Sequence, residues 1–454
     1  MEIDLDLKGN FRKFSEYFGF TLPLWMESRK TLFFFSFLDF AFIYFYFKKI
    51  SLIDAYFFDT GRYIIFGIIF CLISYLNGRY SFFREYKQIL KKLYSLFIRS
   101  VLVLITIYVI DKILIINFSN WIPLGRDDGL KILLGSYLIQ SIKFILDINI
   151  FQKEFIYLIG EENAIKKFKE YSKIISNKKK LIFRNFSEYK KDSAKFKTFI
   201  LLDSNYQNKL DNFLFLISER YEVITAYRWC EKYLQRIPAE YLNKDLMDIN
   251  NFFNNQDSLN WRLKRFGDIF VSFFLILITL PLIILAILLI KLEDNGPIFY
   301  TQYRTGLYGK PFKIFKLRSM KQNSEKSGPV WAQKKDPRIT NIGRVLRKSR
   351  IDELPQLFSV ITGEMSLIGP RPERPEIDKT LIEEIPFYNY RNIIKPGLSG
   401  WAQVNYNYGA SIKDSKIKFS YEIFYLRNYS LLLDLLILFK TLKLIINLEG
   451  SDPK

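Results

Sequence analysis

Four apolar blocks in the first third of the chain limit its fold more than any other feature. They cover residues 31–47, 63–76, 96–118 and 130–150. About 20 apolar residues are needed to cross a bilayer as a helix, so the first two blocks need help from their flanks. The pattern predicts four transmembrane helices within residues 31–150, after a polar N-terminus at residues 1–30.

The charges beside these blocks predict their orientation. The formal net charge of the chain is +21, and basic residues collect on the cytoplasmic side of membrane helices. They precede the first block and fill the loop after the second, whereas the loops at 48–62 and 119–129 carry fewer. This places the N-terminus and everything after residue 150 in the cytoplasm. The charge also predicts anionic partners: lipid headgroups, phosphorylated substrates or nucleic acid.

Two absences restrict the chemistry. The chain has no histidine, which excludes imidazole bases, nucleophiles and metal ligands. Its two cysteines, Cys71 and Cys230, lie far apart and predict neither a disulfide framework nor a zinc site. An enzyme of this composition would depend on carboxylates, helped by Arg, Lys and a hard metal ion.

Residues 151–250 change to short apolar runs between basic helical stretches. Residues 155–159 end at Gly160 and residues 199–202 end at Asp203, as buried parallel strands followed by helices do. We predict a Rossmann-like α/β middle domain. Its first turn lacks a G-x-G-x-x-G fingerprint, so a structural or regulatory role is favoured over nucleotide binding.

A fifth apolar block covers residues 269–290. Its length suits a fifth span, but Pro281 lies near its middle and removes one helical hydrogen bond. A full crossing would also carry Lys291 and the basic segment after it outside, against the charge rule. We therefore favour a re-entrant membrane helix that enters and leaves on the cytoplasmic face, with Pro281 as the helix break.

The C-terminal part, residues 261–454, has short strands and turns, and we expect it to form an α+β catalytic domain. Asp352 and Glu353 lie there among many cations, which favour ionised carboxylates and would hold a pyrophosphate beside them. In Gly369-Pro370-Arg371-Pro372 the two prolines fix the backbone around one guanidinium. The basic residues of this stretch are Lys316, Arg318, Arg338, Arg344, Arg347, Lys348, Arg350 and Arg371.

The same residues carry a resemblance to the bacterial sugar transferase family, the polyprenyl-phosphate hexose-1-phosphate transferases. The resemblance covers about residues 261–448, and the preceding domains resemble the large multi-span subgroup that begins exopolysaccharide or O-antigen synthesis. The ordered motifs are Lys264-Arg265-Phe-Gly-Asp268, Lys316-Leu-Arg318, Asp336-Pro-Arg338, Asp352-Glu353-Leu-Pro355-Gln356, Gly369-Pro370-Arg371-Pro372 and Pro396-Gly397-Leu-Ser-Gly400-Trp401.

The resemblance implies a two-step transfer of a hexose-1-phosphate from a UDP-sugar, by default UDP-glucose or UDP-galactose. Asp352 would form a phosphosugar intermediate and release UMP, and polyprenyl (undecaprenyl) phosphate would then accept the group. Glu353 would hold Mg²⁺. Phosphate ligands would be Lys316, Arg318, Arg347 and Arg371, supported by Gln356, Pro370 and Pro372.

The resemblance also implies a place in the bacterial inner (plasma) membrane, with the catalytic domain on the cytoplasmic face. Anionic lipids are expected partners, nucleic acid is not, and a homodimer is left open. Three residues depart from the family pattern: Ser359 replaces a frequent Asn, Asn392 stands where an Arg-His pair is common, and Glu422 replaces Asp. They leave the Asp352-Glu353 pair intact but weaken any prediction of the sugar.

Two alternatives from other classes are kept. A lipid-linked glycosyltransferase would release UDP instead of UMP and usually needs a separate nucleotide-binding fold with a D-x-D-like metal site, which the sequence lacks. A membrane scaffold would have basic and aromatic residues interleaved on one face. Here the basic residues cluster with Pro, Gly and the acidic pair.

Overall fold

The computed structural model describes residues 29–53, 60–80, 89–117, 126–150, 154–176, 181–185, 197–202, 222–242, 259–294, 296–322, 336–406 and 411–447. Residues 1–28, most of the basic loop after the second apolar block, and Asp203 lie outside these ranges. The chain divides into two compact units, Met1–Trp229 and Cys230–Lys454.

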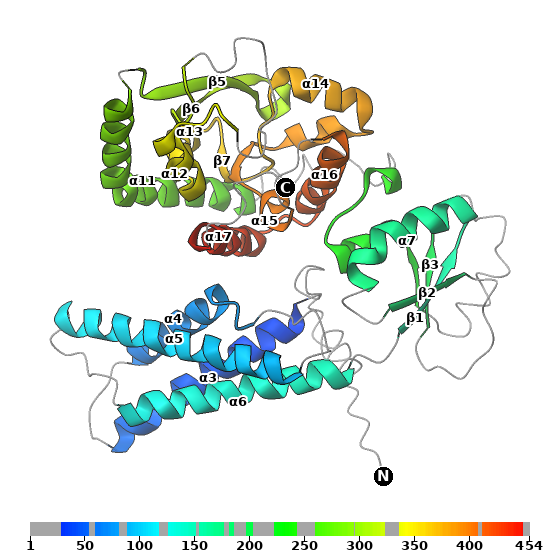
Figure 1. The fold of residues 1–454 in the computed structure, drawn as a ribbon. Helices are drawn as coiled ribbons and strands as arrows, with labels where there is room; N and C mark the ends of the chain where they lie inside the picture. Colours follow the sequence, from blue (N-terminus) through cyan, green and yellow to red (C-terminus); the bar gives the residue numbers. More distant parts are fainter. Residues whose placement is uncertain are drawn as a thin grey trace. The chain divides into compact units, whose positions relative to one another are not determined.

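The first unit contains four long helices (Figure 1). They are α3 (Lys30–Ile53), α4 (Thr60–Leu76), α5 (Ile89–Asn117) and α6 (Arg126–Ile150). α3 packs against α4 and α6, and α5 packs against the same two helices. Their shared core takes residues from every helix, including Ile43, Phe66, Val103 and Ile132. We call these four helices the helical block.

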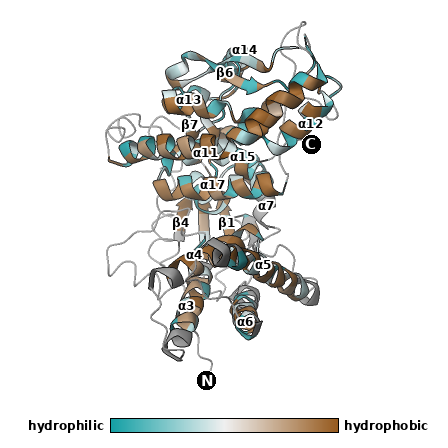
Figure 2. Cartoon of the chain, turned by 90° about the vertical axis from the view of Figure 1, so that its left-hand side faces the viewer, coloured by the Kyte–Doolittle hydropathy of each residue, from teal (hydrophilic) through white to brown (hydrophobic). Residues whose placement is uncertain are grey.

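The helical block has the polarity of a membrane protein. Phe37 and Leu138 expose 63% and 59% of their surface, whereas Asp39, Arg79 and Gln140 are fully buried. A soluble bundle shows the reverse distribution, because water solvates charge and excludes apolar surface. Figure 2 shows the apolar character of α3 and α5. Among the described residues, Leu93–Lys112 and Leu259–Glu293 are long and apolar enough to cross a membrane.

A parallel sheet follows in the first unit, with strand order β2-β1-β3-β4. Its elements are β1 (Glu154–Ile159), α7 (Glu162–Ser176), β2 (Leu181–Asn185), β3 (Lys197–Leu201), β4 (Glu222–Thr225) and α9 (Ala226–Trp229). The buried Trp229 ring contacts Phe168 of α7 and Phe183 of β2, so aromatic packing closes this domain.

The second unit is α+β. It contains η3 (Cys230–Leu234), η4 (Ala239–Tyr241), α11 (Leu259–Glu293), β5 (Phe299–Thr305), η5 (Leu307–Gly309), β6 (Pro311–Leu317), α12 (Asn341–Ser349), η6 (Ile351–Glu353), α13 (Gln356–Thr362), β7 (Ser366–Ile368), α14 (Pro375–Glu384), η7 (Tyr388–Ile393), β8 (Gly397–Ser399), α15 (Trp401–Asn405), α16 (Ile412–Arg427) and α17 (Leu431–Ile446). β5 and β6 form an antiparallel hairpin, and β7 pairs in parallel with β8.

The described residues after Trp229 pack with the second unit. Ile237 N donates to Ser420 O at 2.8 Å, and Trp401 Nε1 donates to Gln235 O at 2.9 Å. The segment that follows Trp229 therefore belongs to the second unit. The reason is that these hydrogen bonds join the connecting segment to α15 and α16.

α11 is one continuous helix with Pro281 inside it. Near its start, Lys264 Nζ donates to Asp434 at 2.8 Å and to Ile368 O at 3.0 Å. Near its end, Ala286 and Ile290 pack with buried residues of β6 and α12. Both ends of α11 therefore contact other elements of the second unit. The α11 ribbon changes direction along its length (Figure 1). Much of the helix between them exposes apolar side chains.

Candidate functional site

The Asp352-Glu353 pair lies in a tight turn between two helices. α12 ends at Arg350, which adopts a left-handed conformation with φ 60° and ψ 16°. That conformation stops the helix and starts η6, which carries both carboxylates. Pro355 then precedes α13. Asp352 and Glu353 are only 7% and 8% exposed, so the local backbone holds two adjacent acids in a buried place.

Three cations from three segments meet the Glu353 carboxylate. Lys316 Nζ, at the end of β6, donates to Oε1 at 3.0 Å. Arg371, in the turn after β7, donates to the same oxygen at 2.6 Å. Arg350 lies 3.6 Å from Oε2. The structure thus brings the predicted phosphate ligands Lys316 and Arg371 together beside the acidic pair.

The charges shift the pKa values of this cluster. Burial by itself would raise the pKa of Glu353, but Arg371, Lys316 and Arg350 hold it well below its usual range. Burial lowers the pKa of Lys316, and the negative charge of Glu353 opposes that effect. Glu353 is therefore ionised at neutral pH.

Asp352 differs from its neighbour. Its Oδ1 atom is buried and has no hydrogen-bond partner. Burial and the adjacent charge of Glu353 raise its pKa to about 6, against the influence of Lys316, Arg347 and Arg350. At pH 7 roughly nine tenths of such a group is ionised. The pair thus combines a permanently charged carboxylate with one that has an uncommitted oxygen.

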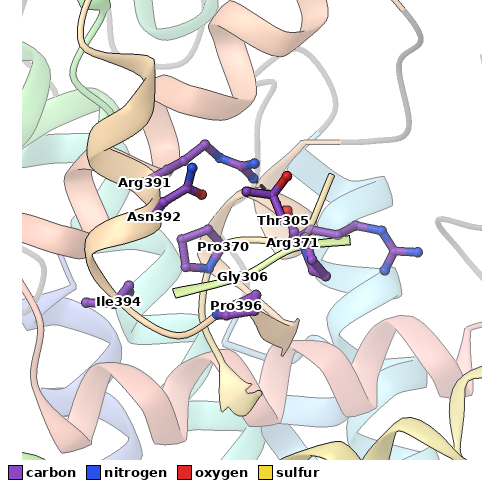
Figure 3. Close-up of a pocket in the computed structure, with 9 residues that line it drawn as sticks. Thr305, Gly306, Pro370, Arg371, Arg391, Asn392, Ile394 and Pro396 are labelled. Carbon is purple, nitrogen blue, oxygen red and sulfur yellow. Dashed lines mark hydrogen bonds between the residues drawn. The ribbon is translucent and has the colours of Figure 1, made fainter. Parts of the chain in front are cut away.

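The other predicted residues have diverse surroundings. Arg347 acts on Asp352 through its charge, whereas Arg318 pairs with Asp294 just after α11. Gln356 is buried and its Nε2 atom has no partner. Pro370 and Pro372 flank Arg371 and line a small pocket (Figure 3). Pro281 lies within α11.

Sequence reasoning counted Arg350 among the cations around the acidic pair without an individual role, and assigned no role to Arg304 or Arg391. Arg350 reaches Glu353. Arg304 of β5 donates to Pro372 O at 3.2 Å, and Arg391 donates to Arg371 O at 2.6 Å. Arg350 could have been found from its position two residues before Asp352. The other two depend on long-range packing and leave no local signal.

The acidic pair offers hard oxygen ligands to a metal ion. In the part of the chain that the structure describes, no cluster of three or more metal-ligating side chains is present. Mg²⁺ commonly binds through one or two carboxylates and completes its shell with substrate phosphates and water. The pair supplies carboxylates that a metal carried by a nucleotide could share, and both oxygens of Glu353 already face cations in this structure.

Cations exceed carboxylates at this site, which suits a polyanion. Lys316, Arg350 and Arg371 face one carboxylate. A diphosphate would compete with Glu353 for the same donors and form charge-assisted hydrogen bonds with them. A phosphate held by these donors would lie beside the buried Asp352 carboxylate.

Comparison with known proteins gives a consistent result. The sequence model of the bacterial sugar transferase family matches residues 259–448. The UDP-N-acetylgalactosamine-undecaprenyl-phosphate N-acetylgalactosaminephosphotransferase of Aeromonas hydrophila is 48% identical over 189 residues, 42% of this chain and 45% of that protein. The UDP-glucose:undecaprenyl-phosphate glucose-1-phosphate transferase of Escherichia coli is 36% identical over 185 residues, 40% of each chain.

A shorter relative is covered over most of its length. A Bacillus subtilis protein, provisionally named an undecaprenyl-phosphate N-acetylgalactosaminyl 1-phosphate transferase, is 55% identical over 129 residues, 28% of this chain and 72% of that protein. The alignments with the Aeromonas and E. coli relatives span less than half of their lengths. The matched region contains α11, the acidic pair and the cations around it. The chain belongs to the bacterial sugar transferase family.

Proposed function

We propose that the chain transfers a sugar-1-phosphate from a UDP-sugar to a polyprenyl phosphate and releases UMP. The observation that carries this proposal is the buried Asp352-Glu353 pair among three cations. Its relatives are named for undecaprenyl-phosphate sugar phosphotransfer. The reaction would be the first membrane step of exopolysaccharide or O-antigen assembly.

In the proposed first step, an Asp352 oxygen attacks the sugar-bearing β-phosphorus. An aspartyl–phosphorus bond forms, the bond to the α-phosphate bridging oxygen breaks, and UMP leaves with the bond's electron pair. The buried Oδ1, which accepts no hydrogen bond, supports Asp352 as the nucleophile. Lys316 and Arg371 would stabilise the charge that develops on the phosphates.

In the proposed second step, a phosphate oxygen of the polyprenyl phosphate attacks the same phosphorus. The diphosphate-linked lipid sugar forms, and Asp352 regains its carboxylate. Arg318 and Arg347 are proposed as further phosphate ligands. For Arg318 this requires the anion to compete with Asp294. Gln356, Pro370 and Pro372 would support the site.

We also propose Glu353 as a Mg²⁺ ligand. When bound, the metal would neutralise charge on the diphosphate and the departing UMP. EDTA should therefore abolish turnover, and excess Mg²⁺ should restore it in the same sample. Full turnover in the presence of the chelator would contradict the metal role.

The proposed location is the inner membrane of a bacterium, with the second unit in the cytoplasm. UDP-sugars are too polar to cross a bilayer unaided, so the site must face their source. The proposed re-entrant path of α11 is supported by the contacts of both its ends with one unit. We further propose that the helical block spans the membrane and that β1–β4 form a Rossmann-like domain with a structural or regulatory role.

The sugar is proposed as an N-acetylhexosamine or a hexose. Two relatives named for N-acetylgalactosamine are 48% and 55% identical, while one named for glucose is 36% identical. This order favours UDP-N-acetylgalactosamine over the UDP-glucose or UDP-galactose expected from the family in general.

The nucleotide product decides between this function and its alternative. Purified full-length protein would be mixed with undecaprenyl phosphate, Mg²⁺ and, in separate reactions, UDP-N-acetylgalactosamine, UDP-glucose and UDP-galactose. We expect UMP and a diphosphate-linked lipid with at least one of them. Release of UDP would show a glycosyltransferase and overturn the proposal.

A further inference from the structure

A second buried ion cluster lies behind the Pro370-Arg371-Pro372 turn. Its centre is Arg391 of η7, which is 3% exposed. Arg391 Nε donates to Glu422 Oε2 at 2.8 Å, and its NH2 group donates to Glu422 Oε1 at 2.9 Å. This bidentate pair fixes the plane of the guanidinium.

Further groups surround the pair from neighbouring elements. Asp378 of α14 lies 3.6 Å from Arg391 NH1, and the Tyr388 ring lies under the guanidinium, 5.0 Å from its carbon. Asn392 Nδ2 donates to the other oxygen of Asp378 at 3.4 Å. Glu373 adds negative charge nearby. The cluster thus ties η7, α14 and α16 together.

Hydrogen bonds through Arg371 connect this cluster to the acidic pair. The NH2 group of Arg391 also donates to the main-chain carbonyl of Arg371 at 2.6 Å. The side chain of Arg371 donates to Glu353 Oε1, again at 2.6 Å. In Figure 3 the Arg391 side chain extends toward the Pro370-Arg371 turn, and the Arg371 side chain extends away from Arg391. A single residue therefore joins the buried cluster to the site.

We propose that Arg391 and Glu422 are positioning residues, which hold the Arg371 carbonyl and thereby aim the Arg371 guanidinium at the substrate phosphates. This inference rests on the proposed function. The prolines on either side of Arg371 fix φ at their own positions but leave the peptide between them to be oriented. The hydrogen bond from the buried Arg391 side chain supplies that orientation.

Glu422→Gln is the main test, because it keeps the shape and removes the charge that fixes Arg391. Full-length protein would be assayed with undecaprenyl phosphate and whichever of UDP-N-acetylgalactosamine, UDP-glucose or UDP-galactose the wild type uses best. We expect kcat to fall about 10- to 100-fold, as is common when a supporting partner is lost, with KM within about threefold. A KM that stays near the wild-type value while kcat falls would show that substrate still binds and that the reacting groups are misaligned.

Two variants separate positioning from folding. Glu422→Asp should restore most of kcat, because it retains a carboxylate. Arg391→Lys retains the positive charge but cannot serve Glu422 and the Arg371 carbonyl in one plane, so it should reproduce the kcat loss with KM nearly unchanged. Arg391→Lys also tests the inference if Glu422→Gln does not fold.

A matched control lies in another buried ion pair of the same unit. Asp434 pairs with Lys264 at 2.8 Å, and among the described residues no hydrogen bond joins it to Arg371 or Glu353. Asp434→Asn should lower thermal stability and leave kcat of the folded protein within about threefold of wild type. Folded Glu422→Gln and Arg391→Lys with wild-type kcat would overturn the inference while the proposed function stands.

Failure of the proposed function would look different, because the wild type itself would then release no UMP. In that case the structure of Arg391→Lys provides the test. Movement of Arg371 away from Glu353 supports the positioning role, and an unchanged 2.6 Å contact overturns it.

Discussion

The helical block and the second unit both bury carboxylates beside cations, but they distribute the charge differently. In the block, Asp39 accepts hydrogen bonds from Tyr80 and Gln140 at 2.9 Å and lies 3.5 Å from Arg79. Arg79 also donates to Ser74 and to Ser136 O. Neutral and main-chain groups therefore share most of the contacts.

In the second unit, three cations converge on Glu353 alone. The Asp39 cluster distributes its hydrogen bonds over neighbouring segments of the helical block. It connects these segments in a region whose apolar side chains face outward. The Glu353 cluster concentrates positive charge, which an anionic ligand can use. The two clusters therefore differ in charge: three cations face the Glu353 carboxylate, whereas Asp39 pairs with Arg79 and accepts from two neutral donors. Each cluster also leaves one carboxylate oxygen without a hydrogen-bond partner.

Among the variants that test this comparison, Asp352→Asn should cause the largest loss of turnover. The amide is nearly isosteric with the carboxylate but is a poor nucleophile, so turnover should fall by roughly a thousandfold or more. Incubation with radiolabelled UDP-sugar and no lipid should label the wild-type protein only. Equal labelling of the folded variant would exclude Asp352 as the nucleophile.

Labelling of single cysteines at the two ends of α11 tests its path through the membrane and should give the next largest effect. In a variant without Cys71 and Cys230, single cysteines would replace the exposed residues Asn260 and Lys310. An impermeant maleimide should leave both unmodified in intact cells and modify both after the membrane is opened. Modification of position 310 alone in intact cells would show that α11 crosses the membrane fully.

Lowering the pH should reduce turnover by an intermediate amount. Because burial and Glu353 raise the pKa of Asp352 to about 6, the nucleophilic carboxylate is protonated as the pH falls through that value. Turnover should drop about tenfold between pH 7 and pH 5. A rate that stays constant down to pH 5, with the protein folded, would contradict the raised pKa.

Asp39→Asn should have the smallest effect on turnover. The amide still hydrogen-bonds with Tyr80 and Gln140 but no longer balances Arg79. We expect a loss of about 1 kcal/mol in the stability of the helical block and turnover per folded molecule within about twofold of wild type. Thermal denaturation and kinetics on the same detergent-solubilised sample measure both. A loss comparable to that of Asp352→Asn would erase the distinction between the two clusters.

Much of the local structure could be predicted from the sequence. The strands expected at residues 155–159 and 199–202 correspond to β1 (Glu154–Ile159) and β3 (Lys197–Leu201), because apolar runs that end at Gly160 and Asp203 have a strong strand signature. β2 and β4 were not predicted. They are short and carry polar or charged residues, so packing decides their conformation.

The residues around Glu353 could be predicted from the sequence, but the partners of Arg318 and Arg391 could not. Proximity in sequence and the family motifs brought Lys316, Glu353 and Arg371 into one prediction, and the structure joins them. The partner of Arg318, Asp294, lies across the β5–β6 hairpin, and the partner of Arg391, Glu422, lies on α16. Such pairs depend on tertiary packing, which leaves no periodic signal in the sequence.

The left-handed backbone of Arg350 has an evolutionary consequence. A residue with a Cβ atom loses roughly 1 kcal/mol in that conformation, so selection for heat resistance alone would favour glycine at this position. Glycine would also remove the cation 3.6 Å from Glu353. Selection for stability alone would therefore act against the charge arrangement beside Glu353 at this position.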